Sequence, residues 1–200
     1  HALLWYTLCE QLGDPSPDHM GFERPWQEFT CCRLVTFPKG DFAYTLVRQY
    51  LFDEAEQVRL TSFARSAFPL LCDVAGKVIR EEAYHLMHVK GLVSRLGDAT
   101  EESHRRMHTA VDAAFPQALG IFEKLEGEDA LIEARVFSGN AALQQTWISR
   151  VKPTLEAASL KLPPNPTPDL GGRRGSHAPD LQHLVDDMQK VYRLAPGARW

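Results

Sequence analysis

The stretch PLLCDVAGKVIREEAYHLMHVKGLVSRL, residues 69–96, predicts a long helix that packs inside a bundle. Its apolar residues recur at alternating spacings of four and three, which places them on one face of a helix. The positions on this face are Leu71, Ala75, Val78, Glu82, His85, Val89, Leu92 and Leu96. Six of these eight are apolar, and the two exceptions, Glu82 and His85, adjoin at the centre. We therefore expect both side chains to point into the interior.

Two interpretations of Glu82 and His85 are open. Burying a polar group without a partner costs roughly 2–7 kcal/mol, so a polar pair in the middle of a packed face needs a reason. The Glu-x-x-His spacing is the half-site that carboxylate-bridged di-iron bundles use. The other interpretation is a buried ion pair that fixes the register of the helices. The spacing by itself favours the ion pair.

A second helix is predicted over residues 42–66, and its middle is polar too. One face of this helix carries Phe42, Leu46, Gln49, Asp53, Glu56, Leu60 and Phe63. In an antiparallel hairpin, the polar middles of the two helices would lie level with each other. A competing face is defined by Val47, Tyr50, Leu51 and Val58, and it would leave Asp53 and Glu56 in solvent.

Composition limits the class of protein. Two hundred residues, 44% hydrophobic and 24% charged, are typical of one globular domain over residues 1–200. A net charge of −4 favours neither nucleic acid nor an anionic membrane as partner. The sequence contains no apolar run near the ~20 residues that span a bilayer. Its four cysteines form no C-x-x-C motif, so we expect neither a zinc site nor a disulfide framework, and the expected location is cytoplasmic.

The remaining segments predict an all-α fold. Residues 1–12 indicate the end of a helix, and because the chain starts at His1 within that pattern we expect native sequence upstream to be missing. Further helices are expected from an N-cap at Thr100 to about residue 125, at 140–162 and at 179–194, with a short helix or extended piece near 129–137. Bundle helices thus fill 1–162, and a basic glycine loop plus a helix fill 163–200. Only residues 30–37 give a strand signal, and Trp200 suggests a docked tail.

Two smaller patterns carry possible chemistry. The segment GGRRG at 171–175 is expected to expose backbone N–H groups and the guanidiniums of Arg173 and Arg174, which suit a phosphate, a carboxylate or a partner surface. His104 and His108 have the i, i+4 spacing of metal-binding pairs. Because they lie among arginines without a carboxylate motif, a solvated face is the favoured interpretation.

Three segments carry a resemblance to a known family. They are FAYTLVRQYLFDE (42–54), REEAYHLMHVKGLVSRLGDATEESHRRM (80–107) and GGRRGSHAPDLQHLVDDMQKVYRLAPGARW (171–200). They resemble the structural subunits of bacterial multicomponent phenylacetyl-CoA epoxidases, which act in phenylacetate catabolism. The resemblance implies a ferritin-like bundle with its first helices truncated. It also implies a non-catalytic scaffold in a homo- or hetero-oligomer, without a cofactor of its own. A partner catalytic subunit would hold the di-iron centre, and this subunit would pair with it and stabilise it.

The resemblance also implies a degenerate metal site. Members of the family carry a carboxylate four residues before the histidine, the position of Glu81. Because Glu82 is acidic as well, a residual metal half-site of Asp53, Glu82 and His85 stays open. In a scaffold, Asp53, Glu56, Glu81, Glu82 and His85 would form an internal polar network in place of the metal. A complete di-iron centre needs a second Glu-x-x-His motif, and residues 1–12 contain none.

Two other functions compete with the scaffold. The chain could itself be a di-iron carboxylate oxygenase subunit, which the polar helix centres favour. It could also be a CoA-thioester-binding module in which Arg173 and Arg174 hold phosphates. The scaffold hypothesis makes a quantitative prediction: if His85 belongs to a buried pair, His85→Ala should destabilise the bundle by about 3–5 kcal/mol.

Overall fold

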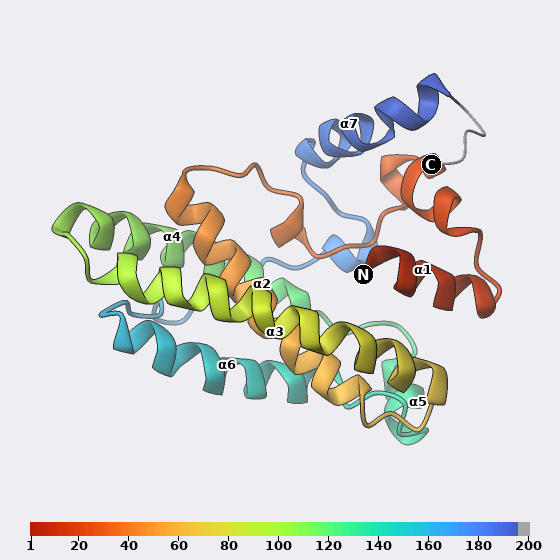
Figure 1. Cartoon of the computed structure of the whole chain (residues 1–200), viewed down its shortest axis with the longest axis horizontal. Coiled ribbons are helices and arrows are strands. Elements are labelled where there is room, and N and C mark those ends of the chain that lie inside the picture. The colour runs from red at the N-terminus through yellow and green to blue at the C-terminus, as the bar shows by residue number, and fades with distance from the viewer. Residues whose placement is uncertain (196–200) are drawn as a thin grey trace.

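The computed structural model describes residues 1–195, which form an all-α, ferritin-like bundle (Figure 1). The helices are α1 (Ala2–Gln11), α2 (Phe42–Phe63), α3 (Pro69–Gly97), α4 (Glu101–Leu119), α5 (Glu128–Glu133), α6 (Asn140–Ala157) and α7 (Asp180–Leu194). Short 3-10 or π turns lie at His19–Glu23, Trp26–Glu28, Arg33–Val35, Gly120–Phe122 and Gly172–Arg174. The strand signal at 30–37 was wrong, because this part of the chain forms a 3-10 turn. The expected docking of Trp200 lies outside the described residues.

Helix α2 is the centre of the bundle. It packs against α3, α4 and α6, and Figure 1 shows α3 lying across it. Its buried residues come from both faces that the sequence offered: Ala43, Leu46, Val47, Tyr50, Leu51, Asp53, Glu54, Ala55, Val58 and Leu60. The two faces therefore do not compete, because three neighbouring helices cover most of the circumference of α2.

The buried face of α3 departs from the predicted one in its second half. Its buried residues are Val74, Ala75, Val78, Glu82, Leu86, Val89, Val93 and Gly97. Leu86 thus takes the place predicted for His85, and Val93 takes that of Leu92. The reason is geometric: an α-helix has 3.6 residues per turn, so a strict seven-residue repeat drifts by about 20° with each heptad. Over the 29 residues of α3 the drift moves the buried face by one position.

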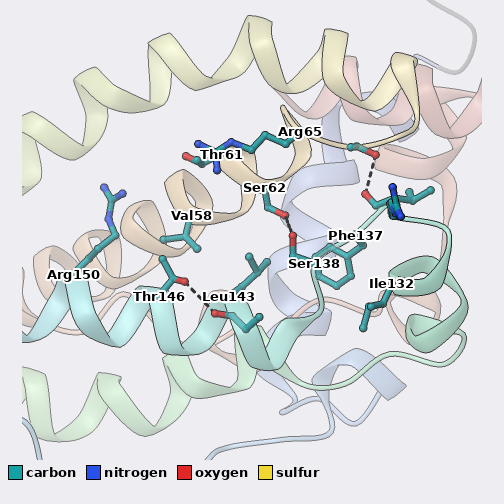
Figure 2. A pocket seen from close by; sticks show the side chains of 14 residues that line it. Val58, Thr61, Ser62, Arg65, Ile132, Phe137, Ser138, Leu143, Thr146 and Arg150 are labelled. Carbon is teal, nitrogen blue, oxygen red and sulfur yellow. Dashed lines mark hydrogen bonds between the residues drawn. The ribbon is translucent and has the colours of Figure 1, made fainter.

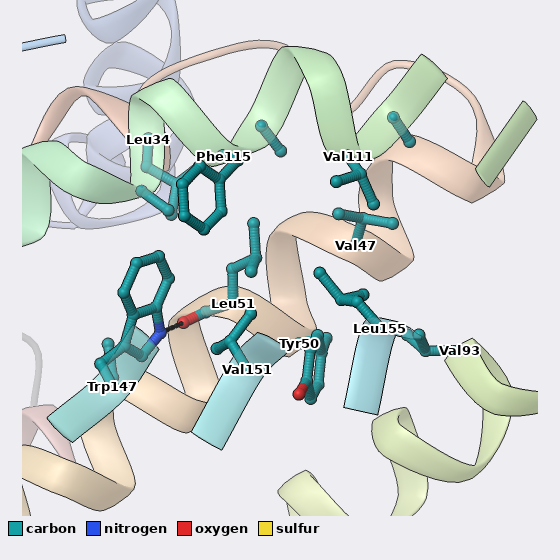
Figure 3. Packing of buried hydrophobic residues seen from close by; sticks show 14 of the residues in the cluster. Leu34, Val47, Tyr50, Leu51, Val93, Val111, Phe115, Trp147, Val151 and Leu155 are labelled. Atoms are coloured by element: carbon teal, nitrogen blue, oxygen red, sulfur yellow. Dashed lines mark hydrogen bonds between the residues drawn. The ribbon is translucent and has the colours of Figure 1, made fainter. Parts of the chain in front are cut away.

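The main core joins α2, α4 and α6 around Trp147 (Figure 3). The Trp147 ring stacks on Phe115 of α4 at a centroid distance of 5.2 Å. Its indole N–H donates to the carbonyl oxygen of Leu51 at 3.0 Å, so the buried polar atom is satisfied. Leu34, from the connection before α2, is also fully buried in this core. The connection therefore packs on the bundle.

Local sequence signals set the helix ends. Asp41 accepts a hydrogen bond from the Tyr44 N–H at the start of α2, and Thr100 forms a capping box with Ser103 at the start of α4. The predicted N-cap at Thr100 is confirmed. At the end of α3 a side chain on Gly97 would meet the Ala158 carbonyl oxygen at 2.7 Å, so glycine permits the close approach of α3 to the end of α6.

The C-terminal segment returns to the N-terminal connection. Asp169 donates its N–H to the Pro116 carbonyl at 3.0 Å and pairs with Arg33 at 2.9 Å. Leu181 and Val185 of α7 then pack on Phe29. Figure 1 shows α7 beside the N-terminal segments rather than within the bundle. In residues 1–195, none of the helices is long and apolar enough to cross a membrane.

Candidate functional site

An acidic pair lies at the α2–α3 contact, halfway along the bundle. Asp53 of α2 is 2% exposed and Glu82 of α3 is 4% exposed. The two carboxyl groups are close enough for the charge of Glu82 to raise the pKa of Asp53. The structure therefore brings together these two of the predicted site residues. Ferritin-like proteins place their metal ligands in such a position, on inward faces of neighbouring helices.

Asp53 is a carboxyl group that retains a proton near neutral pH. Gln49 donates its side-chain N–H to Oδ1 at 2.5 Å, whereas Oδ2 is buried and has no hydrogen-bond partner among the described residues. Burial, and then the charge of Glu82, raise the pKa of Asp53 to about 7 against the opposing effects of Gln49 and His85. A proton on Oδ2 makes this oxygen a donor beside the Glu82 carboxylate.

Imidazole groups border the pair on its solvent side. Glu82 lies 3.2 Å from Nδ1 of His85 and 3.9 Å from Nδ1 of His1. The other nitrogen of His1 contacts Glu81 at 3.0 Å. The His85 side chain is 58% exposed and that of Glu81 is 72% exposed. The cluster thus runs from a buried acid, Asp53, through Glu82 to histidines in contact with water.

The predicted five-residue internal network is not assembled. Glu81 and His85 were expected inside, and this was wrong because the buried face of α3 drifts toward Leu86. Glu56 is directed elsewhere and pairs with Arg59 on its own helix at 3.0 Å. Only Asp53 and Glu82 of the five are buried.

The predicted histidine pair on α4 serves local contacts. His104 Nδ1 lies 2.7 Å from the Gly97 carbonyl oxygen, and His108 lies 3.3 Å from Asp112. These partners belong to the helix ends and to the helix surface. The solvated-face interpretation therefore describes this pair better than a metal site does.

The ligand set of a di-iron centre does not fit this site. In residues 1–195, no three His, Cys, Asp or Glu side chains converge in a way that could hold a metal ion. One oxygen of Asp53 is engaged by Gln49, and the His85 side chain is 58% exposed although its Nδ1 lies 3.2 Å from Glu82. The residual half-site of Asp53, Glu82 and His85 stays a prediction.

A second buried carboxylate was missed. Glu54, next to Asp53, lies 2.8 Å from Arg150 Nε of α6 and 3.8 Å from Lys90 Nζ of α3. The signal was available, because Glu54 occupies the centre of the face defined by Val47, Leu51 and Val58. The polar residues in the middle of α2 are therefore buried on two different sides of the helix.

The glycine loop holds its arginines differently from the prediction. Glu123, which is nearly buried, accepts from the Gly171 N–H at 2.7 Å and from Arg174 Nε at 2.8 Å. Two further loop N–H groups, those of Arg174 and Ser176, donate to the Gly171 carbonyl. Of the five backbone N–H groups at 171–175 that were expected to be exposed, those of Gly171, Arg174 and Gly175 instead donate to acceptors within the protein. The Arg174 side chain is 74% exposed, whereas Arg173 turns inward.

A basic groove lies apart from the acidic pair, between α2 and α6 (Figure 2). Its volume is about 490 Å³. Arg65, Arg135 and Arg150 line it, and the hydroxyl groups of Ser62 and Ser138 bridge its walls at 2.7 Å. The groove includes neither Asp53 nor Glu82, so the two regions are separate sites.

The fold and the acidic pair define a ferritin-like bundle whose polar centre lacks a di-iron ligand set within the described residues. Over residues 1–200 the chain matches the family described as "Phenylacetic acid catabolic protein", and it belongs to that family. It is 30% identical over 192 residues to a subunit of the 1,2-phenylacetyl-CoA epoxidase of Escherichia coli (strain K12). This match covers 96% of the chain and 77% of that relative. The resemblance found in the sequence is thereby confirmed.

Proposed function

We propose that this chain is a structural subunit of a multicomponent oxygenase that epoxidises phenylacetyl-CoA, and that it pairs with and stabilises a di-iron catalytic subunit. The likeness to a subunit of an epoxidase supports the assignment to such a complex. The observation that carries the scaffold role is the state of the acidic pair: Asp53 and Glu82 are buried at the bundle centre, and a proton on Asp53 neutralises one of them.

The chemistry of ligation supports this proposal. Ferritin-like di-iron centres draw several carboxylates and two imidazoles inward, whereas of the predicted site residues only Asp53 and Glu82 are buried here. The His85 side chain is 58% exposed, which suits the inward ligand position of a Glu-x-x-His motif poorly. Under this proposal the chain carries no cofactor, and the iron belongs to the catalytic partner.

The packing around the pair gives it a structural role. Asp53 and Glu82 lie where α2 meets α3, and α2 also contacts α4 and α6. A protonated acid beside a carboxylate forms a compact polar contact, which favours one register of α2 against α3. A rigid bundle of this kind is suited to supporting a partner whose own centre performs the chemistry.

The test removes all three potential donors at once. The variant Asp53→Asn, Glu82→Gln, His85→Ala is assembled with the catalytic subunit and reductase, and turnover of phenylacetyl-CoA is measured per assembled complex. We expect co-purification, together with turnover within about twofold of the unaltered complex. Omitting the chain should lower the yield or stability of the catalytic subunit.

Two outcomes would overturn the proposal. One is an assembled variant complex that loses turnover together with iron, which would make this chain a catalytic di-iron subunit. The other is a catalytic subunit whose stability and turnover are the same with and without the chain. Size-exclusion chromatography of each mixture establishes assembly before turnover is compared.

A further inference from the structure

The glycine loop places one arginine inside the molecule and one outside. Gly171 and Gly175 both adopt the left-handed conformation, and a side chain on Gly172 would meet the Cys31 carbonyl oxygen at 2.6 Å. Glu123 anchors the loop through Gly171 and Arg174. Arg173 is therefore held at a defined position, where its side chain lines a pocket of about 310 Å³.

The Arg173 guanidinium has no carboxylate partner among the described residues. Its hydrogen bond to the Ile121 carbonyl oxygen is a long one, at 3.4 Å. Arg59 lines the same pocket and is the second positive charge there. Burial, and then the charge of Arg59, lower the pKa of Arg173. A desolvated cation beside a like charge is unfavourable unless an anion joins them.

The residues that line the pocket carry two positive charges, Arg59 and Arg173, and no negative one. Glu56 pairs with Arg59 at 3.0 Å and so balances one guanidinium. Glu123, the nearest acid of the loop, is engaged by Arg174 and by the backbone. An anion in the pocket would contact the Arg173 guanidinium, whose planar fork matches a carboxylate.

The walls of the pocket are apolar. Phe63 and Phe137 lie with ring centroids 5.8 Å apart, and Leu71, Leu125 and Leu131 complete the lining on other sides. The lining residues contain no hydroxyl group, and the side-chain amide of Asn140, which also lines the pocket, donates to Glu128 and to the Glu123 carbonyl. A phosphate group, which carries more charge and seeks several donors, is a poorer match than a carboxylate on an apolar body.

We propose that this pocket binds a small carboxylate with an aromatic or similarly apolar body, whose carboxylate contacts Arg173 and Arg59. The body lies against Phe63 and Phe137. The volume of about 310 Å³ is at the lower end of small-molecule sites, which suits a single ring with a short acid arm. This binding site is separate from the acidic pair and does not depend on the proposed scaffold role.

The test is a calorimetric or NMR titration of the intact chain with phenylacetate, the anion of the acid that the family description names. Phenylacetamide keeps the ring without the charge, and acetate keeps the charge without the ring. We expect saturable binding of phenylacetate and at least tenfold weaker binding of the other two. Arg173→Gln should weaken phenylacetate binding at least tenfold.

Arg95→Gln is the control, because it makes the same change at an exposed arginine of α3 that does not line the pocket. It should leave phenylacetate affinity unchanged. Because Arg173→Gln could perturb the loop, Leu131→Trp provides a second variant: it fills the pocket from its exposed rim and keeps both guanidiniums, and it should abolish binding. The proposal is overturned by no saturable binding up to about 10 mM, by equal affinity for phenylacetamide, or by unchanged affinity in folded Leu131→Trp.

Discussion

Asp53 and Glu54 are consecutive residues of α2, both almost fully buried, and the protein neutralises them in different ways. Asp53 faces α3, where the nearest charged group is another acid, Glu82, and where a proton occupies the carboxyl up to a pH of about 7. Glu54 lies beside cations of two helices, Arg150 of α6 at 2.8 Å and Lys90 of α3 at 3.8 Å. One carboxyl group is neutralised by a proton, and the other by cations.

This difference predicts which perturbation should change the stability of the protein at each carboxyl group. A carboxylate paired with arginine depends on its partner, because removing the partner leaves a buried charge. A protonated acid depends on pH, because raising the pH forces the charge to form in the interior. The comparison therefore yields predictions that separate the two sides of α2.

The largest expected effect comes from Arg150→Met, which leaves Glu54 with only the more distant Lys90. We expect a loss of about 2–3 kcal/mol in the free energy of unfolding at pH 7, below the range for fully buried pairs because Arg150 is partly exposed. Urea denaturation followed by circular dichroism measures it.

The double variant Glu54→Gln, Arg150→Met should recover part of that loss, because no buried charge remains. Arg65→Met is the matched control: Arg65 lines the same groove, and no carboxylate lies within ion-pair distance of it among the described residues. Its substitution should change stability by less than about 0.5 kcal/mol. Equal losses of stability in Arg65→Met and Arg150→Met would show that the contact between Glu54 and Arg150 does not stabilise the protein.

The next effect is that of Asp53→Asn, and its sign depends on pH. The pKa of Asp53 rises from an ordinary 3.8 to about 7 on folding, so between these values the folded state binds the extra proton. Stability should therefore fall as pH rises from about 4 to 7, and this contribution is lost above pH 7. Asparagine removes the ionisation, so at pH 8 the variant should be more stable than the unaltered protein.

Chemical denaturation at several pH values between 4 and 8 measures this effect. The unfolding free energies of wild type and Asp53→Asn should be similar near pH 4, and the difference between them should grow toward pH 8. A variant that loses stability relative to wild type as the pH rises would show that Asp53 is an anion stabilised by a partner.

A smaller effect is expected from Glu82→Gln on the titration of Asp53. Removing the Glu82 charge should lower the pKa of Asp53, which should still stay above its ordinary value because burial is the first cause of the shift. Carboxyl carbon NMR of labelled protein follows the titration. Glu81 is the exposed neighbour of Glu82, so Glu81→Gln should leave the pKa of Asp53 unchanged. An equal change of this pKa in both variants would mean that Glu82 is not the group beside Asp53.

The smallest effect is that of His85→Ala. Because the side chain is 58% exposed, its contact with Glu82 should contribute less than about 1 kcal/mol. The face predicted from the sequence implied about 3–5 kcal/mol instead. A thermal or urea unfolding curve decides between these values, and a loss near 3 kcal/mol would place His85 in the interior.

Local signals explain why most helix boundaries were predictable. Thr100 and Ser103 are close in the chain and specify a capping box, and the apolar spacing of 69–96 specifies a helix whatever packs on it. The rotation of a helix face is less local. His85 and Leu86 differ by one position, and only the accumulated drift of a long helix against its neighbours decides which of them is buried.

Long-range contacts explain what the sequence did not reveal of the site. The pairing of Glu54 with Arg150 joins residues 96 positions apart, and the engagement of Arg174 by Glu123 joins residues 51 apart. Charge type alone does not tell which carboxylate meets which guanidinium. Asp53 was identified because two polar helix centres lie level in a hairpin, which is a regular feature that the sequence does carry.

The measurement that tests the central claim most directly is the iron content of the isolated chain after anaerobic loading with Fe(II) and removal of loosely bound metal. If a proton rather than a metal neutralises the Asp53–Glu82 pair, the chain should retain far less than one iron atom, and Glu82→Gln with His85→Ala should leave that value unchanged. Retention of about two iron atoms per chain, lost in that double variant, would contradict the account.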